Sequence, residues 1–288
     1  MFGWKASNYI EFKCIPKKPP TFRPLSNPRS EDCALPFNGD IQIQNNDNSC
    51  STLTMFCRNK GKYYALTCAH VACASNPVKD FLLKNEMSKI NDVVNARNIY
   101  DRNEYFYKPA KLNKKKQLNT FHCNTVSKFN SEADIMSIPV GKKEDFKQLG
   151  GDDMENIVLN LKEINEELYK ATKSNEGFVE VCTSNYTKGF IIERNYCYID
   201  KTLKKLIYKN AVKVKSKSSF LQNGDSGRLV YFKDQQNVWQ PFAYAVCEID
   251  DDESADSEKS NLCLKLDKAL NLLDLNSCQY FNCDRFVR

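Results

Sequence analysis

The sequence lacks several features that mark specialised classes of protein. Its amino terminus has no basic start followed by an apolar stretch, so we expect no secretory signal. No apolar run approaches the length that crosses a bilayer, which argues against a membrane protein. The thirteen cysteines include no CxxC pair, so no metal site and no cofactor is predicted. From these absences we expect a cytoplasmic protein.

The cysteines themselves leave alternatives open. Their number is odd and their spacing shows no regular framework of pairs. We therefore expect mostly free thiols, with some disulfides as the first alternative and a zinc site as the second. The N-glycosylation sequon Asn185-Tyr186-Thr187 would matter only if the protein were exported.

A strong charge of one sign is also absent. The 42 basic and 36 acidic residues give a net charge of +6, and the basic residues are spread out apart from the run Lys114-Lys115-Lys116. A short lysine run is usually a solvated surface, so the sequence predicts no nucleic-acid partner. The hydrophobic content of 41% is enough for a sizeable core. The oligomeric state is not indicated.

Histidine is scarce, which restricts any catalytic base of this type to His70 or His122. His70 ends an apolar run that starts at Tyr63, as expected for a residue delivered by a strand. We interpret His122 as structural, because no strand that opens on an aspartate and no glycine turn accompanies it. For His70 the alternative interpretation is a core histidine beside a strand.

A nucleophile motif is present at Gly224-Asp225-Ser226-Gly227, between two β-rich runs. A serine hydroxyl is a weak nucleophile until a base takes its proton, and flanking glycines let backbone N–H groups turn toward a developing oxyanion. Asp134 opens a short alternating segment that predicts a strand to Val140. A carboxylate on a partly buried strand needs a partner, whereas a surface carboxylate is the other interpretation of Asp134.

The motifs around His70, Asp134 and Ser226 resemble the three catalytic motifs of trypsin-like serine peptidases. Their order along the chain is the one that the chymotrypsin fold uses. The resemblance covers roughly residues 45 to 275 and is closer to the intracellular and bacterial-type branches than to secreted digestive trypsins. Val71 and Gln222 stand where secreted members usually carry half-cystines, so two of the family disulfides cannot form. The motif residues are Leu66-Thr67-Cys68-Ala69-His70-Val71, Ala133-Asp134-Ile135-Met136-Ser137-Ile138 and Asn223-Gly224-Asp225-Ser226-Gly227.

The resemblance implies an all-β fold of two antiparallel Greek-key β-barrels with a connecting helix and a C-terminal helix. We expect an N-terminal extension over residues 1–40 and a first barrel over 41–145 that carries His70 and Asp134. A helical connector is expected over 146–176, and a second barrel over 177–288 that carries Ser226 and the C-terminal helix.

Helical periodicity supports both helices. Apolar residues recur at spacings of three and four from Met154 to Leu168, with Asp152 and Glu155 placed like a capping pair. We expect this helix to pack on the barrels, with docking of a partner as the alternative. The segment 264–273 is apolar at the same spacing and predicts the C-terminal helix.

The function implied by the resemblance is that of a serine endopeptidase acting on a peptide or protein substrate. Ser226 would be the nucleophile, His70 the general base and Asp134 the carboxylate that orients it. The N–H groups of Gly224 and Ser226 would form the oxyanion hole, and Asp225 would be a scaffold residue. The alternative is an inactive protein of the peptidase fold that acts as an interaction module.

The sequence departs from secreted trypsins near the nucleophile. Phe220 stands where trypsins carry the aspartate that selects basic side chains, so this specificity is not implied; Glu248 is another candidate charge. Arg29 is followed by Ser30-Glu31-Asp32, and no lysine or arginine between there and Ile41 offers an apolar pair, so an activating cleavage is not expected. Asp225 then needs another partner, for instance Arg228 or backbone N–H groups. We accordingly expect the intact chain to be active without processing, if it is active at all.

Overall fold

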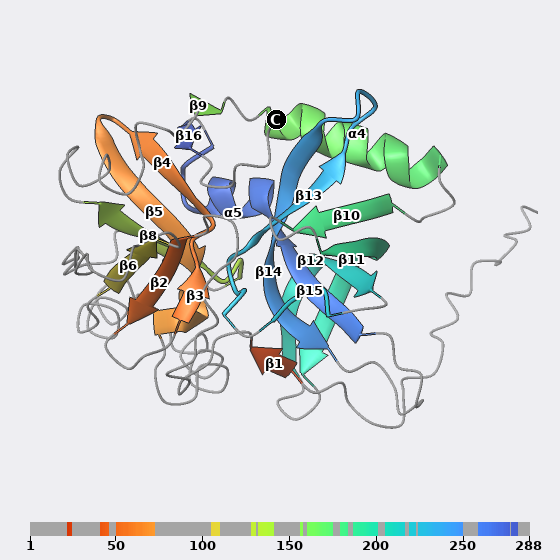
Figure 1. Ribbon diagram of the computed structural model, residues 1–288, viewed down its shortest axis with the longest axis horizontal. Coiled ribbons are helices and arrows are strands. Elements are labelled where there is room, and N and C mark those ends of the chain that lie inside the picture. Colours follow the sequence, from red (N-terminus) through yellow and green to blue (C-terminus); the bar gives the residue numbers. More distant parts are fainter. Residues whose placement is uncertain are drawn as a thin grey trace, which may run out of the picture.

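The computed structural model describes most of the predicted strands and two α-helices (Figure 1). The described residues are 22–24, 41–45, 50–72, 105–109, 128–130, 132–140, 156–157, 160–174, 179–183, 187–200, 205–216, 219–222, 224–249, 259–276 and 278–281. The rival base His122, the Lys114–Lys116 run and the sequon at Asn185 lie outside these ranges.

The second half of the chain forms a closed antiparallel barrel. Its strands follow the order β14-β13-β10-β11-β12-β15, and a further pairing of β14 with β15 closes the ring. Strand β13 returns to lie beside β10 after the β10-β11-β12 meander, which is the Greek-key order. The strands are β10 (Val179–Thr183), β11 (Lys188–Asp200), β12 (Lys205–Ser216), β13 (Leu229–Lys233), β14 (Trp239–Ile249) and β15 (Lys259–Lys265).

The first half, with the C-terminal strand β16, forms a second β body beside this barrel; its strands are orange to olive in Figure 1 except for green β9 and blue β16. A six-stranded sheet has the order β7-β8-β5-β4-β16-β9, and a three-stranded sheet has the order β3-β2-β6. The strands are β2 (Ile41–Asn45), β3 (Cys50–Thr52), β4 (Met55–Asn59), β5 (Lys62–Cys68), β6 (Tyr105–Pro109), β7 (Lys128–Asn130), β8 (Ile135–Val140), β9 (Asn156–Ile157) and β16 (Gln279–Phe281). The predicted all-β, two-barrel fold class with a connecting and a C-terminal helix is confirmed.

Three short strands connect parts of the chain that are distant in sequence. Strand β1 (Phe22–Pro24), from the extension, pairs with β14 of the second barrel. Strand β16 follows the second barrel in sequence but pairs with β4 of the first sheet, and β9 pairs with β16 in turn. The domain boundaries at residues 40, 145 and 176 stay a prediction, and these pairings run across them.

Both helices begin later than their periodicity indicated. Helix α4 spans Leu161–Ser174, because Asn160 caps it: the Asn160 Oδ1 accepts from the N–H of Glu163 at 3.3 Å, and the Asn160 amide donates to the Glu163 carboxylate at 2.9 Å. The start expected near Asp152 is wrong, since residues 156–157 form β9. Helix α5 spans Leu266–Leu272, because Leu264 and Lys265 still belong to β15.

Two apolar clusters form the core. One fills the second barrel and includes Ile164 and Leu168, so the apolar side of α4 packs on that barrel. The other is continuous from first-sheet residues such as Phe56 to second-barrel residues such as Tyr231 and to Leu270 of α5. The two β bodies therefore share one core at their junction, which fixes their relative position.

The described part of the chain contains no helix that is long and apolar enough to cross a membrane. Within it, seven cysteines are free thiols: Cys57, Cys68, Cys182, Cys197, Cys247, Cys263 and Cys278. Cys197 is exposed, whereas Cys68, Cys247 and Cys263 are fully buried. Burial raises the pKa of each of these three thiols well above its usual value, so they remain protonated and poorly nucleophilic.

We predict a corresponding split in thiol reactivity. In the native protein at pH 8, Cys197 should react with an aromatic disulfide reagent at least about 100-fold faster than Cys68, Cys247 or Cys263, because only an accessible thiolate attacks the reagent. Mass spectrometry of the labelled peptides assigns each rate.

Titration of denatured, unreduced protein should find most of the thirteen cysteines free. Three or fewer free thiols would overturn the expectation.

Candidate active site

The pairing of β5 with β8 brings His70 next to Asp134. The last pair of this ladder is Cys68 and Ile135. His70 follows Cys68 by two residues, in the short 3-10 helix Ala69–Ala72, and Asp134 directly precedes Ile135. The N–H of Ala69 donates to the backbone carbonyl of Asp134 at 3.1 Å, which joins the two segments beyond the ladder.

The Asp134 carboxylate binds His70 through both of its oxygens. Its Oδ2 lies 2.6 Å from the ring Nδ1 of His70, and its Oδ1 accepts from the backbone N–H of His70 at 2.9 Å. Asp134 is 0% exposed and adopts a positive φ of 45°, a conformation that aspartate tolerates better than most residues. This two-point contact fixes both the position and the plane of the imidazole.

Ser226, from the second barrel, contacts the other ring nitrogen of His70. Its Oγ lies 3.0 Å from Nε2 of His70 and 3.3 Å from the carbonyl oxygen of Val246 on β14. A hydroxyl has one proton, so it donates to one of these two acceptors at a time. Ser226 is 0% exposed and His70 is 1% exposed, so in this state the side chains are covered.

Tyr208 is a member of the site that the sequence did not reveal. Its hydroxyl donates to Oδ2 of Asp134 at 3.1 Å, the same oxygen that meets the His70 ring. Burial, and then the nearby Asp134 carboxylate, raise the pKa of Tyr208 well above its usual value, so the phenol keeps its proton and can donate. A tyrosine inside a strand carries no signal that separates this role from a core position.

Tyr244 supports the same corner from β14. Its buried hydroxyl donates to the backbone carbonyl of Ala133, directly before Asp134. Tyrosines from two strands of the second barrel therefore hold the aspartate of the first sheet in place.

The Ser226 loop is attached to the three-stranded sheet through Thr52 of β3. The N–H of Thr52 donates to the carbonyl of Ser226 at 2.8 Å, and its hydroxyl donates to the carbonyl of Gly224 at 2.9 Å. Gly227 packs against the same residue: a Cβ there would lie 2.3 Å from the Thr52 carbonyl oxygen. Its N–H donates to Ala245 of β14 at 2.8 Å, so the glycine is held from both sides.

Asp225 is paired with Arg228 in the interior. One carboxylate oxygen of Asp225 lies 2.6 and 2.7 Å from two guanidinium nitrogens of Arg228, and the other accepts from the N–H of Gln222 at 2.8 Å. Both residues are buried. The ion pair spans the chain on either side of Ser226, and it gives Asp225 a partner within its own loop.

A metal site is the other use to which this cluster could be put. Ligand atoms of Cys68, His70 and Asp134 all lie within 4.8 Å of one another. However, the Cys68 thiol donates to the carbonyl of Ala245, so it is already engaged in another contact. The direct 2.6 Å contact between His70 and Asp134 also leaves no room for an ion between them.

Other candidate residues take structural positions. Phe220 is buried in the core of the second barrel, and Glu248 is nearly buried on β14.

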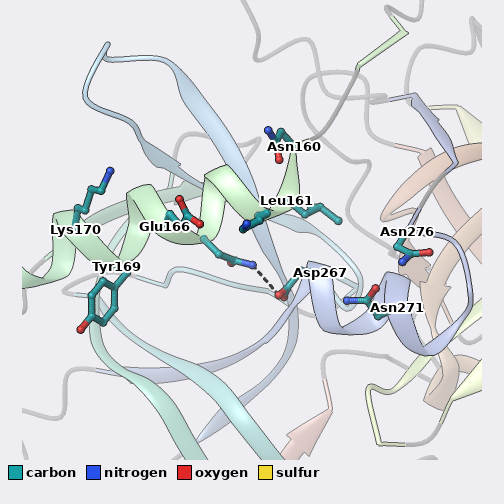
Figure 2. A pocket seen from close by; sticks show the side chains of 10 residues that line it. Asn160, Leu161, Glu166, Tyr169, Lys170, Asp267, Asn271 and Asn276 are labelled. Carbon is teal, nitrogen blue, oxygen red and sulfur yellow. Dashed lines mark hydrogen bonds between the residues drawn. The ribbon is translucent and has the colours of Figure 1, made fainter.

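A pocket of about 750 Å³ lies between α4 and α5, lined by amides and charged side chains that include Asn271 and Asn276 (Figure 2). In it, the Asn165 amide donates to Asp267 at 2.7 Å. The pocket includes none of the three site residues, so it is separate from them.

No model of a protein family and no curated protein matches the sequence. The structure is similar to that of an "Alpha-lytic protease homolog N4", with 11% identity and a TM-score of 0.41, over 83% of this chain and 95% of the other. A second similar structure carries the description "A glutamic acid specific serine protease utilizes a novel histidine triad in substrate binding". Its identity is 9% and its TM-score 0.39, over 83% of this chain and 96% of the other.

We predict that Gly227→Ala is severely destabilising. The change combines a positive φ of 89° with a Cβ 2.3 Å from a backbone oxygen, and we expect a loss of more than about 3 kcal/mol in the free energy of unfolding, measured with urea. Gly61→Ala is the matched control, because its φ is 78° and no atom lies within 4 Å of the added Cβ. Equal losses for the two variants would contradict the close contact.

We also predict that Arg228→Met destabilises the protein by about 3 to 5 kcal/mol, since it leaves the buried Asp225 carboxylate without its cation. Lys188→Met is the control: it removes an ion pair of similar length, 2.8 Å to Glu180, on an exposed surface. The control should leave the melting temperature unchanged. A similar decrease in both variants would argue against a structural role for the buried pair.

Proposed function

We propose that the protein is a serine endopeptidase whose catalytic residues are His70, Asp134 and Ser226. One observation carries the proposal: the His70 ring stands between a carboxylate oxygen at 2.6 Å and a serine Oγ at 3.0 Å, with a different ring nitrogen facing each. This is the contact order of an activated nucleophile, its base and the group that orients the base. A peptide or protein is the corresponding substrate.

In this proposal each group has a role that its contacts support. With Nδ1–H donated to Asp134, the Nε2 lone pair faces Ser226 and accepts its proton as Oγ attacks the peptide carbonyl. The Asp134 carboxylate stabilises the imidazolium that forms, and Tyr208 and the N–H of His70 share its charge. His70 then gives the proton to the leaving amine, and water repeats the sequence on the acyl-enzyme.

The oxyanion hole is proposed at the N–H groups of Gly224 and Ser226. Within the described residues neither group donates a hydrogen bond, so both are available to a substrate oxygen. Gly224 has a φ of 93°, which a residue with a side chain rarely adopts and which turns the peptide plane before Asp225. The pairing of Asp225 with Arg228 and with the Gln222 N–H makes Asp225 the scaffold of this loop.

The second candidate is an inactive interaction module of the same fold. It is favoured by the burial of Ser226 and His70, which have almost no exposed surface in this state. The two candidates differ in the reactivity of one hydroxyl: an activated serine reacts with a fluorophosphonate and an ordinary buried serine does not.

We predict that the full-length protein is labelled by a fluorophosphonate and that Ser226→Ala abolishes the labelling. The free energy of unfolding should change by no more than about 1 kcal/mol, because only a hydroxyl with two alternative acceptors is lost. Ser260→Ala is the control, since Ser260 is a fully buried serine whose hydroxyl has no partner among the described residues. Labelling that persists in Ser226→Ala would refute the assignment.

A further inference from the structure

Strand β1 of the N-terminal extension lies on the edge of β14 (Figure 1). The pairing is antiparallel, with Phe22 opposite Ile249, Arg23 opposite Glu248 and Pro24 opposite Cys247. Three residues are a very short strand, and its partner segment begins directly after Val246. A strand edge exposes backbone N–H and C=O groups that can pair with any extended peptide.

This edge leads to the nucleophile. The carbonyl oxygen of Val246 lies 3.3 Å from Oγ of Ser226. Because the two strands are antiparallel, each step toward the C-terminus of β1 meets a β14 residue one position closer to Val246. A peptide that continued this register would place its next residue opposite Val246. A peptide bound in the same direction as β1 therefore has its C-terminal end nearest to Ser226. In this direction the carbonyl group of its last paired residue faces the serine.

We propose that β1 occupies the peptide-binding edge of β14 as an inhibitory strand supplied by the chain itself, and that a substrate peptide must displace it. The occupant that this edge fits is an extended peptide, bound antiparallel to Cys247–Ile249. That β1 inhibits peptide hydrolysis rests on the proposed function. That another peptide can replace β1 on the edge of β14 does not.

The backbone chemistry of β1 makes it a replaceable occupant. Pro24 has no N–H, so opposite Cys247 it cannot donate to β14. Antiparallel pairs alternate between those that exchange both hydrogen bonds and those that exchange none. Pro24 therefore lies in a pair that exchanges none, and the pair that exchanges both is Arg23 and Glu248. An ordinary peptide bound in the same register makes the same contact.

The covered state of the site agrees with this proposal. Ser226 and His70 have almost no exposed surface while β1 is in place, so a peptide reaches them only after a rearrangement. The sequence led us to expect an intact chain that is active without processing. With β1 paired beside Val246, we instead expect release of β1 to precede activity.

The test uses the full-length chain with single substitutions in β1. Arg23→Pro removes the one N–H that can donate to β14 and keeps an extended backbone. Arg23→Ala keeps the N–H at the position paired with Glu248 and shortens only the side chain. Phe22→Pro introduces proline one residue earlier. At that position the alternation of hydrogen-bonded and non-hydrogen-bonded pairs directs the backbone N–H away from β14, so no hydrogen bond to β14 is lost. Each variant is made with Ser226 intact and with Ser226→Ala.

Two measurements that need no activity are made in the Ser226→Ala background. The first is amide hydrogen exchange at Glu248, and the second is the binding of a fluorescent peptide with the sequence of residues 18–28, followed by anisotropy. Arg23→Pro should raise the exchange rate at least tenfold and should bind the peptide. The Arg23→Ala and Phe22→Pro chains should exchange at the rate of the chain with an unchanged β1. Equal exchange in all chains, or no peptide binding to Arg23→Pro, would overturn the proposal.

The third measurement is the rate of fluorophosphonate labelling with Ser226 intact. Arg23→Pro should be labelled at least tenfold faster than the wild type and the two control variants. Equal labelling of all four chains, with exchange raised in Arg23→Pro, would overturn the inhibitory role while leaving the peptidase proposal standing. No labelling of any chain, with exchange raised and the peptide bound, would overturn the peptidase proposal and the inhibition with it.

Discussion

The site depends on one contact between the two β bodies, the docking of the Ser226 loop on Thr52. His70 and Asp134 come from the first sheet and Ser226 comes from the second barrel, so their hydrogen bonds form only if the bodies meet in one arrangement. The backbone of Thr52 sets that arrangement by donating to Ser226 and by filling the space beside Gly227. The shared apolar core holds the two β bodies together, but apolar contacts are non-directional. The hydrogen bonds of Thr52 are directional, so they fix how the two bodies are aligned.

The interior around Asp134 shows how a buried charge is maintained. The carboxylate is fully buried and receives donors from the His70 ring, the His70 backbone and Tyr208. Burial of a carboxylate without hydrogen-bond donors carries a large desolvation cost, and these contacts offset it. The same environment keeps neighbouring thiols and phenols protonated, and they therefore act as donors rather than as competing nucleophiles.

Local sequence predicted the elements that carry the chemistry, because their signals are local. The strand ending at Cys68, the aspartate before Ile135 and the glycine turn at Ser226 each lie within one short motif, and the structure brings them together. It did not predict Tyr208 at the carboxylate or β16 on β4, since these are contacts between residues far apart along the chain. The start of α4 was wrong for a different reason. Two asparagine or aspartate caps compete there, and only the bonds of Asn160 decide between them.

The short strand β1 connects these observations to regulation. Arg228 already pairs with Asp225 inside the Ser226 loop, so under the proposed function this loop needs no new amino terminus to order it. Control must then act elsewhere, and the edge of β14 beside Val246 is a place where a peptide and the site meet. An inhibitor attached to the same chain acts at a high effective concentration, which is why we propose that a three-residue strand is enough. The weakness of each individual contact is then what allows a substrate to displace it.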